Sequence, residues 1–137
     1  MDCRYLWAVV FAVTGCTPPD YHRCEKPNRV SLTIRGNDWQ PMGDNLLHIR
    51  VYDTRDDWVE QSDAVELKNN GSLEIEYQCG LDQGVSYGVA TYINTNNTGG
   101  CQRADDAWVY DLGDTSNDVL LEVSPKDNTD SAACEQF

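Results

Sequence analysis

The chain has 137 residues, and its 23 acidic and 10 basic residues give a formal net charge of −13 at pH 7. A chain of this length forms one domain, and its acids are spread along the sequence, which is typical of a solvated surface and not of a disordered acidic tail. Such a surface repels phosphate backbones and anionic lipid headgroups, so nucleic acid is excluded as a partner.

The N-terminal residues have the pattern of an export signal. Tyr5 to Val13 are nine residues without a charge. At ~1.5 Å per residue they span about half of the apolar core of a bilayer, which is too short for a transmembrane helix. This length fits the apolar region of a secretory signal. Small residues and a cysteine follow directly, in the segment Val13-Thr14-Gly15-Cys16.

This segment resembles the lipobox of bacterial lipoproteins, in which an apolar residue and two small residues precede a cysteine. The resemblance implies a signal peptide over residues 1–15, cleavage after Gly15, and lipid on the Cys16 sulfur and its new amino group. Two or three acyl chains would hold the protein at a membrane, because each buried methylene contributes ~0.8 kcal/mol. Thr17, in place of aspartate, favours the outer membrane of a Gram-negative cell envelope under the sorting rule of enteric bacteria. The alternative is that Cys16 is an ordinary half-cystine just inside a conventional signal.

Residues 17–28, TPPDYHRCEKPN, carry three prolines and little apolar character, and with Cys16 they form a predicted tether over residues 16–28. From Arg29 onward, apolar and polar residues alternate with a period of two, which predicts strands. In chain order the predicted strands centre on Val30–Ile34, Leu47–Val51, Val65–Leu67, Leu73–Tyr77, Val85–Ile93, Trp108–Leu112 and Val119–Val123. Asn69-Asn70-Gly71 predicts a tight hairpin turn between the third and fourth strands, because Asn and Gly accept the positive φ of such turns.

These seven short strands, with polar outer faces and almost no helical periodicity, predict an all-β fold. The count is that of an antiparallel, immunoglobulin-like sandwich. We place this domain at residues 29–124, followed by a tail over residues 125–137 that is held by Cys134.

Four cysteines remain once Cys3 leaves with the signal and Cys16 carries lipid: Cys24, Cys79, Cys101 and Cys134. An even number suits two disulfides in an oxidising compartment, and no C-x-x-C or Cys/His spacing favours a metal site. If the strands alternate in direction, Cys24 and Cys79 lie at one end of the sandwich and Cys101 and Cys134 at the other. We therefore favour the pairs Cys24–Cys79 and Cys101–Cys134, although the tail after Ser124 has enough freedom to change the second pair.

The loop between the fifth and sixth strands lies within YINTNNTGGCQRADDAWVYDL, residues 92–112. Asn94, Asn96 and Thr98 fall at alternate positions, and Asp105 and Asp106 precede the aromatic strand. The arrangement is similar to small secreted bacterial sandwich domains of the transthyretin-like or carboxypeptidase-regulatory-like type. Their penultimate hairpin carries an Asp-x-Asn-x-Asn-Gly loop, then an acidic residue and an aromatic strand. The resemblance covers roughly residues 29–124.

Oxygen ligands at alternate positions suit calcium, so the hypothetical ligands are Asn94, Asn96, Thr98, Asp105 and Asp106. We expect no cofactor, or at most weakly bound calcium, because only two of these residues are carboxylates. The favoured interpretation is that the Asn, Thr and Gly residues satisfy the hydrogen bonds of the turn's own backbone. A disulfide at Cys101 would then hold the loop in place of an ion.

No set of residues predicts catalysis. His22 lies in the tether and His48 on the outer face of a strand, and no serine or cysteine nucleophile motif accompanies either. Glu74 and Glu76 face the same side of a strand, which polar alternation explains, since acid–base catalysis also needs one carboxyl in an apolar pocket. We predict that the protein is not an enzyme.

Aromatic residues are the better functional lead. Trp39 and Trp58 lie in inter-strand loops, and Tyr52 and Tyr92 fall on outward strand positions. Such rings either stack on sugars or anchor a protein partner, or else they cover the ends of the sandwich, which we favour. The predicted function is a membrane-anchored, non-enzymatic binding or structural module of the cell envelope, with an envelope protein favoured slightly over a polysaccharide as partner. The alternative is a calcium-dependent carbohydrate-binding or adhesion module that uses loop 94–106.

Overall fold

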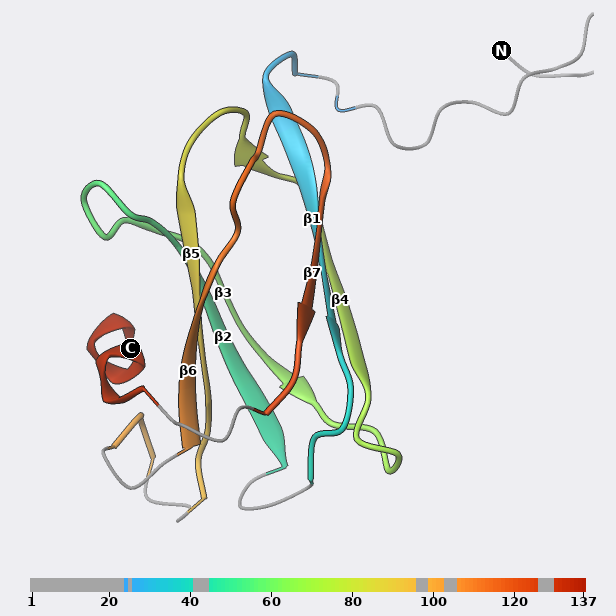
Figure 1. Cartoon of the computed structure of the whole chain (residues 1–137), viewed down its shortest axis with the longest axis vertical. Coiled ribbons are helices and arrows are strands. Elements are labelled where there is room, and N and C mark those ends of the chain that lie inside the picture. The colour runs from blue at the N-terminus through green and yellow to red at the C-terminus, as the bar shows by residue number, and fades with distance from the viewer. Residues whose placement is uncertain (1–23, 25, 41–44, 96–98, 103–105, 126–129) are drawn as a thin grey trace, which may run out of the picture.

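The structure, a computed structural model, describes residues 24, 26–40, 45–95, 99–102, 106–125 and 130–137. In these residues seven strands form two sheets that pack as a sandwich (Figure 1). The prediction of an all-β, seven-stranded fold is therefore confirmed. The signal segment, the lipobox with Cys16, and His22 lie outside the described residues.

The two sheets contain three and four strands. In spatial order, the three-stranded sheet consists of β4 (Leu73–Asp82), β1 (Arg29–Gly36) and β7 (Val119–Val123). The four-stranded sheet consists, in the same sense, of β3 (Val59–Glu66), β2 (Leu46–Asp53), β5 (Tyr87–Ile93) and β6 (Asp106–Asp111). A short 3₁₀ helix, η1 (Ser131–Gln136), follows the last strand.

Neighbouring strands pair antiparallel except β1 and β7, which are parallel. The exception follows from strand parity, because the first and seventh strands of an alternating chain run in the same direction. The connectivity also differs from that of an immunoglobulin constant domain, whose first two strands share a sheet. Here β1 and β2 lie in different sheets, so the connection between them crosses from one layer to the other.

The predicted turn at Asn69-Asn70-Gly71 forms, but it does not close a hairpin. Gly71 has φ +74° and its N–H donates to the Lys68 carbonyl at 2.8 Å. However, β3 pairs with β2 and β4 pairs with β1, so this turn carries the chain between the sheets. A side chain at Gly71 would meet the Trp39 carbonyl oxygen 2.2 Å from its Cβ, since the turn packs on the β1–β2 connection. The hairpin prediction was wrong because sheet membership is set by distant pairing.

Trp39 belongs to the core between the sheets. Its side chain is 1% exposed, and its ring meets that of Trp108 edge-to-face with centroids 4.9 Å apart. Its indole Nε1–H donates to the Val123 carbonyl at 3.3 Å. The prediction of Trp39 as a ligand contact is therefore wrong, and the alternative, a ring that covers the end of the sandwich, is confirmed for this residue.

Both favoured disulfide pairings are confirmed. Cys24 bonds Cys79, and Cys101 bonds Cys134, with Cα–Cα distances of 5.5 and 5.2 Å. The first joins the residues before β1 to β4, and the second joins the β5–β6 connection to η1. Disulfides are typical of proteins that fold in an oxidising compartment, which supports the expected export of the protein.

The C-terminal segment covers β5 and β6 on the outer face of the four-stranded sheet (Figure 1). Every residue of β5 is buried, on both faces of the strand. Small residues line its outward face: a Cβ at Gly88 would lie 2.5 Å from the Tyr52 ring that crosses it, and Ala90 is fully buried. Ala133 of η1 is also fully buried, in a second hydrophobic cluster that contains Tyr52, Ala90, Tyr92 and Ala107. Tyr52 and Tyr92 do point outward from the sandwich, as predicted, but they are buried in this cluster.

Candidate functional site

The residues of the hypothetical calcium loop are only partly described. Asn94 is buried just after β5, and Asp106 is half-buried at the start of β6, where it pairs with Ile93. Asn96, Thr98 and Asp105 lie outside the described residues. Within the described part of the chain, no three His, Cys, Asp or Glu side chains are placed to hold a metal ion. Calcium binding therefore stays a prediction.

The residues considered for catalysis are engaged in other contacts. The His48 ring stacks on Tyr92, with centroids 4.3 Å apart and planes 10° from parallel. Glu74 is exposed and accepts a hydrogen bond from Arg35 Nε at 2.7 Å. Glu76 is exposed on the same outer face, opposite Thr33. Neither glutamate lies in an apolar pocket of the kind that acid catalysis needs.

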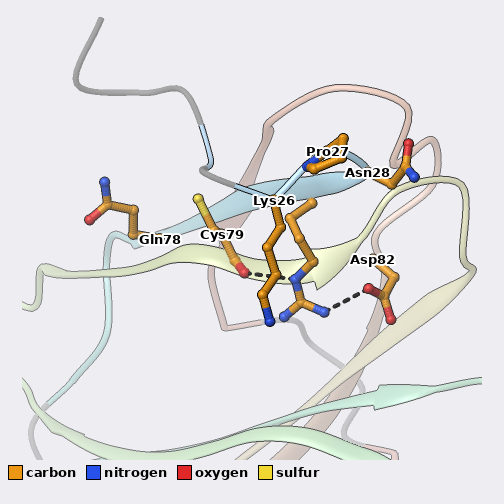
Figure 2. Close-up of a pocket in the computed structure, with 7 residues that line it drawn as sticks. Lys26, Pro27, Asn28, Gln78, Cys79 and Asp82 are labelled. Carbon is orange, nitrogen blue, oxygen red and sulfur yellow. Dashed lines mark hydrogen bonds and ion pairs between the residues drawn. The ribbon is translucent and has the colours of Figure 1, made fainter. Parts of the chain in front are cut away.

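An open cleft of about 810 Å³ lies where the N-terminal segment joins the sandwich (Figure 2). It is lined by Lys26, Pro27, Asn28, Arg29, Gln78, Cys79 and Asp82. Arg29 Nε donates to the Cys79 carbonyl at 3.0 Å, and Arg29 Nη1 lies 2.7 Å from Asp82 Oδ1. Together with the Cys24–Cys79 disulfide, these contacts fasten the start of β1 to β4. We assign the cleft a structural role.

The C-terminal segment packs against aromatic and basic side chains on the outer face of the four-stranded sheet. The Phe137 ring lies edge-to-face with Tyr92 at 4.5 Å, and the Arg50 guanidinium lies 5.1 Å from the centre of the same Phe137 ring. Arg50 Nη1 also donates to the Gln136 carbonyl. The aromatic side chains on this face are therefore packing partners of the C-terminal segment.

Trp58 lies in the turn between β2 and β3 and is 68% exposed. The next residue, Val59, is 37% exposed, and Leu120 of the other sheet is 52% exposed. Within the described residues these are the large hydrophobic side chains that remain exposed. The turn projects to the side of the sandwich (Figure 1), and we call residues 53–59 the Trp58 hairpin. The prediction of Trp58 as an accessible aromatic is consistent with this placement.

Backbone hydrogen bonds hold the Trp58 hairpin in one conformation. The Asp53 N–H donates to the Trp58 carbonyl, and the Asp57 N–H donates to the Asp53 carbonyl, both at 2.9 Å. The Trp58 N–H donates to Asp56 Oδ1 at 3.1 Å. Asp57 adopts the left-handed conformation that closes the turn, with φ 58°. The indole is thus presented from an ordered backbone.

The side chain of Asp53 also stabilises this turn. This buried carboxylate accepts hydrogen bonds from the backbone N–H of Arg55 at 2.9 Å and from its Nε at 3.0 Å. The bonds from Arg55 lower the pKa of Asp53 to about 2. Thr54 donates its N–H and its hydroxyl to the Ser86 carbonyl, each at 3.1 Å, which ties the hairpin to the β4–β5 connection.

The lowered pKa of Asp53 predicts that the hairpin loosens in acid. Its pKa lies below the ordinary value of 3.8, so the unfolded chain takes up this proton at a higher pH than the folded chain does. The stabilisation is therefore complete above about pH 4 and is lost as the pH falls towards about 2. We expect the NMR signal of the Arg55 Nε–H group to follow this titration. A midpoint at the ordinary aspartate value, or the same profile in Asp53→Asn, would contradict it.

A rigid hairpin that presents an exposed indole is suited to recognition. Trp side chains are enriched among the residues that dominate binding energy, and an ordered backbone reduces the entropy lost on binding. The charged residues of the Trp58 hairpin are the carboxylates of Asp53, Asp56 and Asp57 and one arginine, Arg55, which is bonded to Asp53. The sequence could not show which tryptophan is exposed, because Trp39 and Trp58 both follow an aspartate in polar loops.

The comparisons with known proteins add little. No family model matches the chain, and no curated protein matches it. Among solved structures, one titled "Crystal Structure of S.CueP" is similar with a TM-score of 0.43 and 12% sequence identity, over 71% of this chain. The chain covers 61% of that protein's chain. A likeness at this level establishes neither a shared fold nor a shared function. None of the helices in the described residues has the length and hydrophobicity needed to cross a bilayer.

Proposed function

We propose that the protein is an exported, lipid-anchored binding module of a bacterial cell envelope, and that it recognises another envelope protein through the Trp58 hairpin. It acts by binding and not by catalysis. The observation that carries the proposal is the 68% exposure of Trp58 on a turn whose backbone is fixed by hydrogen bonds.

The lipid anchor is proposed from the lipobox at Cys16. The Cys24–Cys79 disulfide limits how far the domain can lie from that anchor. Eight residue steps separate Cys16 from Cys24, so their Cα atoms lie at most about 26–29 Å apart when this segment is extended. Cys24 is bonded to Cys79 near the end of β4. Strand direction places the β2–β3 turn at this same end of the sandwich. The anchored domain would therefore present Trp58 close to the membrane, within reach of membrane-embedded proteins.

The proposal is tested on the mature protein purified from envelopes. Mass spectrometry of its first peptide should find Cys16 as the N-terminal residue, with lipid on both its sulfur and its amino group. Envelope proteins that are solubilised in detergent and immobilised on a resin should retain the wild-type protein, and Trp58→Ala should weaken this retention about tenfold or more, as loss of a dominant anchor does. An unmodified Cys16 would contradict the anchor.

Leu120→Ala is the matched control for recognition, because Leu120 is an exposed hydrophobic residue of the other sheet, 52% exposed. We expect this variant to be retained like the wild type. If the two substitutions weaken retention equally, the binding is general hydrophobic adhesion, and if neither does, the hairpin is not the recognition element.

A further inference from the structure

The surroundings of Trp58 carry a strong negative charge. Residues 53–66 contain six acidic residues and one basic residue, a net charge of −5. The one base, Arg55, is bonded to the buried Asp53 carboxylate. Asp56 and Asp57 directly precede Trp58 and are exposed. A partner that covers Trp58 must therefore bring groups that compensate carboxylates.

From these features we propose that the Trp58 hairpin and the adjoining β3 strand bind a basic protein segment, with an arginine of the partner stacked on the Trp58 indole. This inference rests on the proposed function and names the class of partner. A guanidinium is attracted to the face of an indole, and its N–H groups match carboxylates geometrically. The Trp58 hairpin offers both contacts, because it carries the indole on which a guanidinium can stack and carboxylates with which its N–H groups can pair.

The β3 strand extends this surface beyond the turn. β3 is the outermost strand of the four-stranded sheet, and its eight residues span about 27 Å. Glu66 is exposed and Glu60 is half-buried on one face of this strand, while Asp63 is exposed on its other face, next to Tyr77. Ser62 and Ala64, which lie between Glu60 and Glu66 on the same face, are small and exposed, and Ser62 accepts a hydrogen bond from Arg50 Nε at 3.4 Å. Several basic residues of a partner can therefore meet carboxylates while one of them stacks on Trp58.

The carboxylates also decide between classes of partner. Anionic lipid headgroups and acidic polysaccharides would be repelled by the same charge that attracts a basic segment. Charge complementarity of this kind mainly sets specificity and the rate of association, while the aromatic anchor supplies affinity. The two contributions are separable by mutation, because Glu60 and Glu66 lie on β3, outside the turn that holds Trp58.

The experiment uses the mature protein and fluorescent decapeptides of alternating residues: Arg-Gly, Lys-Gly and Glu-Gly repeats. Fluorescence anisotropy should show binding of the Arg-Gly peptide, weaker binding of the Lys-Gly peptide because ammonium groups stack less well, and none of the Glu-Gly peptide. Trp58→Ala should weaken binding of the Arg-Gly peptide about tenfold or more. The double variant Glu60→Gln/Glu66→Gln should weaken it about three- to tenfold, and added salt should reduce that difference.

The matched control is Glu76→Gln/Glu122→Gln, which removes the same charge from exposed positions on the outer face of the other sheet. This control should bind within about twofold of the wild type, because screening limits attraction between distant charges. Equal weakening by the two double variants, or no effect of Trp58→Ala, would overturn the proposal. Unchanged thermal midpoints show that the variants remain folded.

Intrinsic fluorescence tests the membrane as the other partner. Of the tryptophans in residues 16–137, Trp39 and Trp108 are buried in the core, so a shift in emission reports Trp58. In residues 17–137 exported behind a conventional signal, which carry no lipid, a blue shift with phosphatidylcholine vesicles in the absence of peptide would assign Trp58 to a lipid surface and overturn the proposal. If Trp58→Ala weakens envelope retention while Glu60→Gln/Glu66→Gln and salt do not, the proposed function stands and the basic partner fails.

Discussion

Replacing Trp39 by alanine is expected to lower the free energy of unfolding by about 3–5 kcal/mol, the range for buried aromatic residues truncated to alanine. The side chain is among the largest that are fully buried in the core. Its removal deletes the edge-to-face contact with Trp108 and the hydrogen bond to Val123. It also opens a cavity at the end of the sandwich that the rigid sheets cannot close. Chemical denaturation with a fluorescence or circular dichroism readout measures the loss.

Trp58→Ala is the matched control for this prediction, since it removes the same side chain from an exposed turn. We expect the free energy of unfolding to change by no more than about 0.5 kcal/mol. Similar losses in the two variants would mean that Trp58 also packs in the folded protein, and the recognition proposal would lose its basis. Separation of the two effects would show that one tryptophan stabilises the fold while the other is free to bind.

Removing the Cys101–Cys134 disulfide, in Cys101→Ala/Cys134→Ala, is expected to cost about 3–4 kcal/mol. The two cysteines are 33 residues apart in the chain. The chain-entropy model assigns a stabilisation of about 3–4 kcal/mol to a disulfide that closes a loop of that length. The loss falls on the C-terminal segment first, because this disulfide joins η1 to the β5–β6 connection. Hydrogen exchange should show η1 losing protection, together with the outward residues of β5 that it covers.

Cys24→Ala/Cys79→Ala is the control for this effect. Its separation is 55 residues, so the entropic cost is similar at about 4 kcal/mol, but the bond lies at the other end of the sandwich. We expect its loss to loosen the start of β1 and to leave the protection of η1 intact. If η1 keeps its protection without Cys101–Cys134, the contacts of Ala133 and Phe137 hold the segment by themselves.

Most of the strands and the disulfide pairing were predictable from the sequence because both depend on local periodicity and parity. The third strand is the exception: it was predicted around Val65–Leu67, whereas β3 spans Val59–Glu66, because residues 60–63 are all polar and show no alternation. Residues such as Leu47, Ile49 and Val51 alternate with polar neighbours, and this period of two allows one face of a strand to enter a core. Once seven alternating strands are accepted, each cysteine is assigned to one end of the sandwich. The pairs Cys24–Cys79 and Cys101–Cys134 follow from that assignment.

The different burial of the two tryptophans could not be predicted in the same way. β1 and β2 belong to different sheets, so the chain between them crosses the open end of the core and Trp39 fills it. β2 and β3 are neighbours in one sheet, so the turn between them points away from the core and Trp58 stays exposed. Which strands share a sheet is decided by pairing between distant segments.

The packing of η1 on the outer face of the sheet is likewise decided by contacts between distant segments. The small outward residues Gly88 and Ala90 on β5 were a signal that something packs on that face, since solvated strands carry longer polar side chains there. Nothing in the local pattern of residues 130–137 identified that segment as the cover. Its position depends on a disulfide and on contacts with residues far away in the chain.

The amino-acid sequence by itself determined the all-β class, the approximate positions of the strands other than β3, and the pairing of the four cysteines of the domain. Periodicity and strand direction are properties of neighbouring residues, which is why they could be inferred without coordinates. Only the tertiary structure decided that Trp39 is buried and Trp58 exposed, that the Asn69–Gly71 turn joins two sheets, and that the chain's end covers β5. Burial depends on which distant segments meet, and that is decided by the packing of the whole chain.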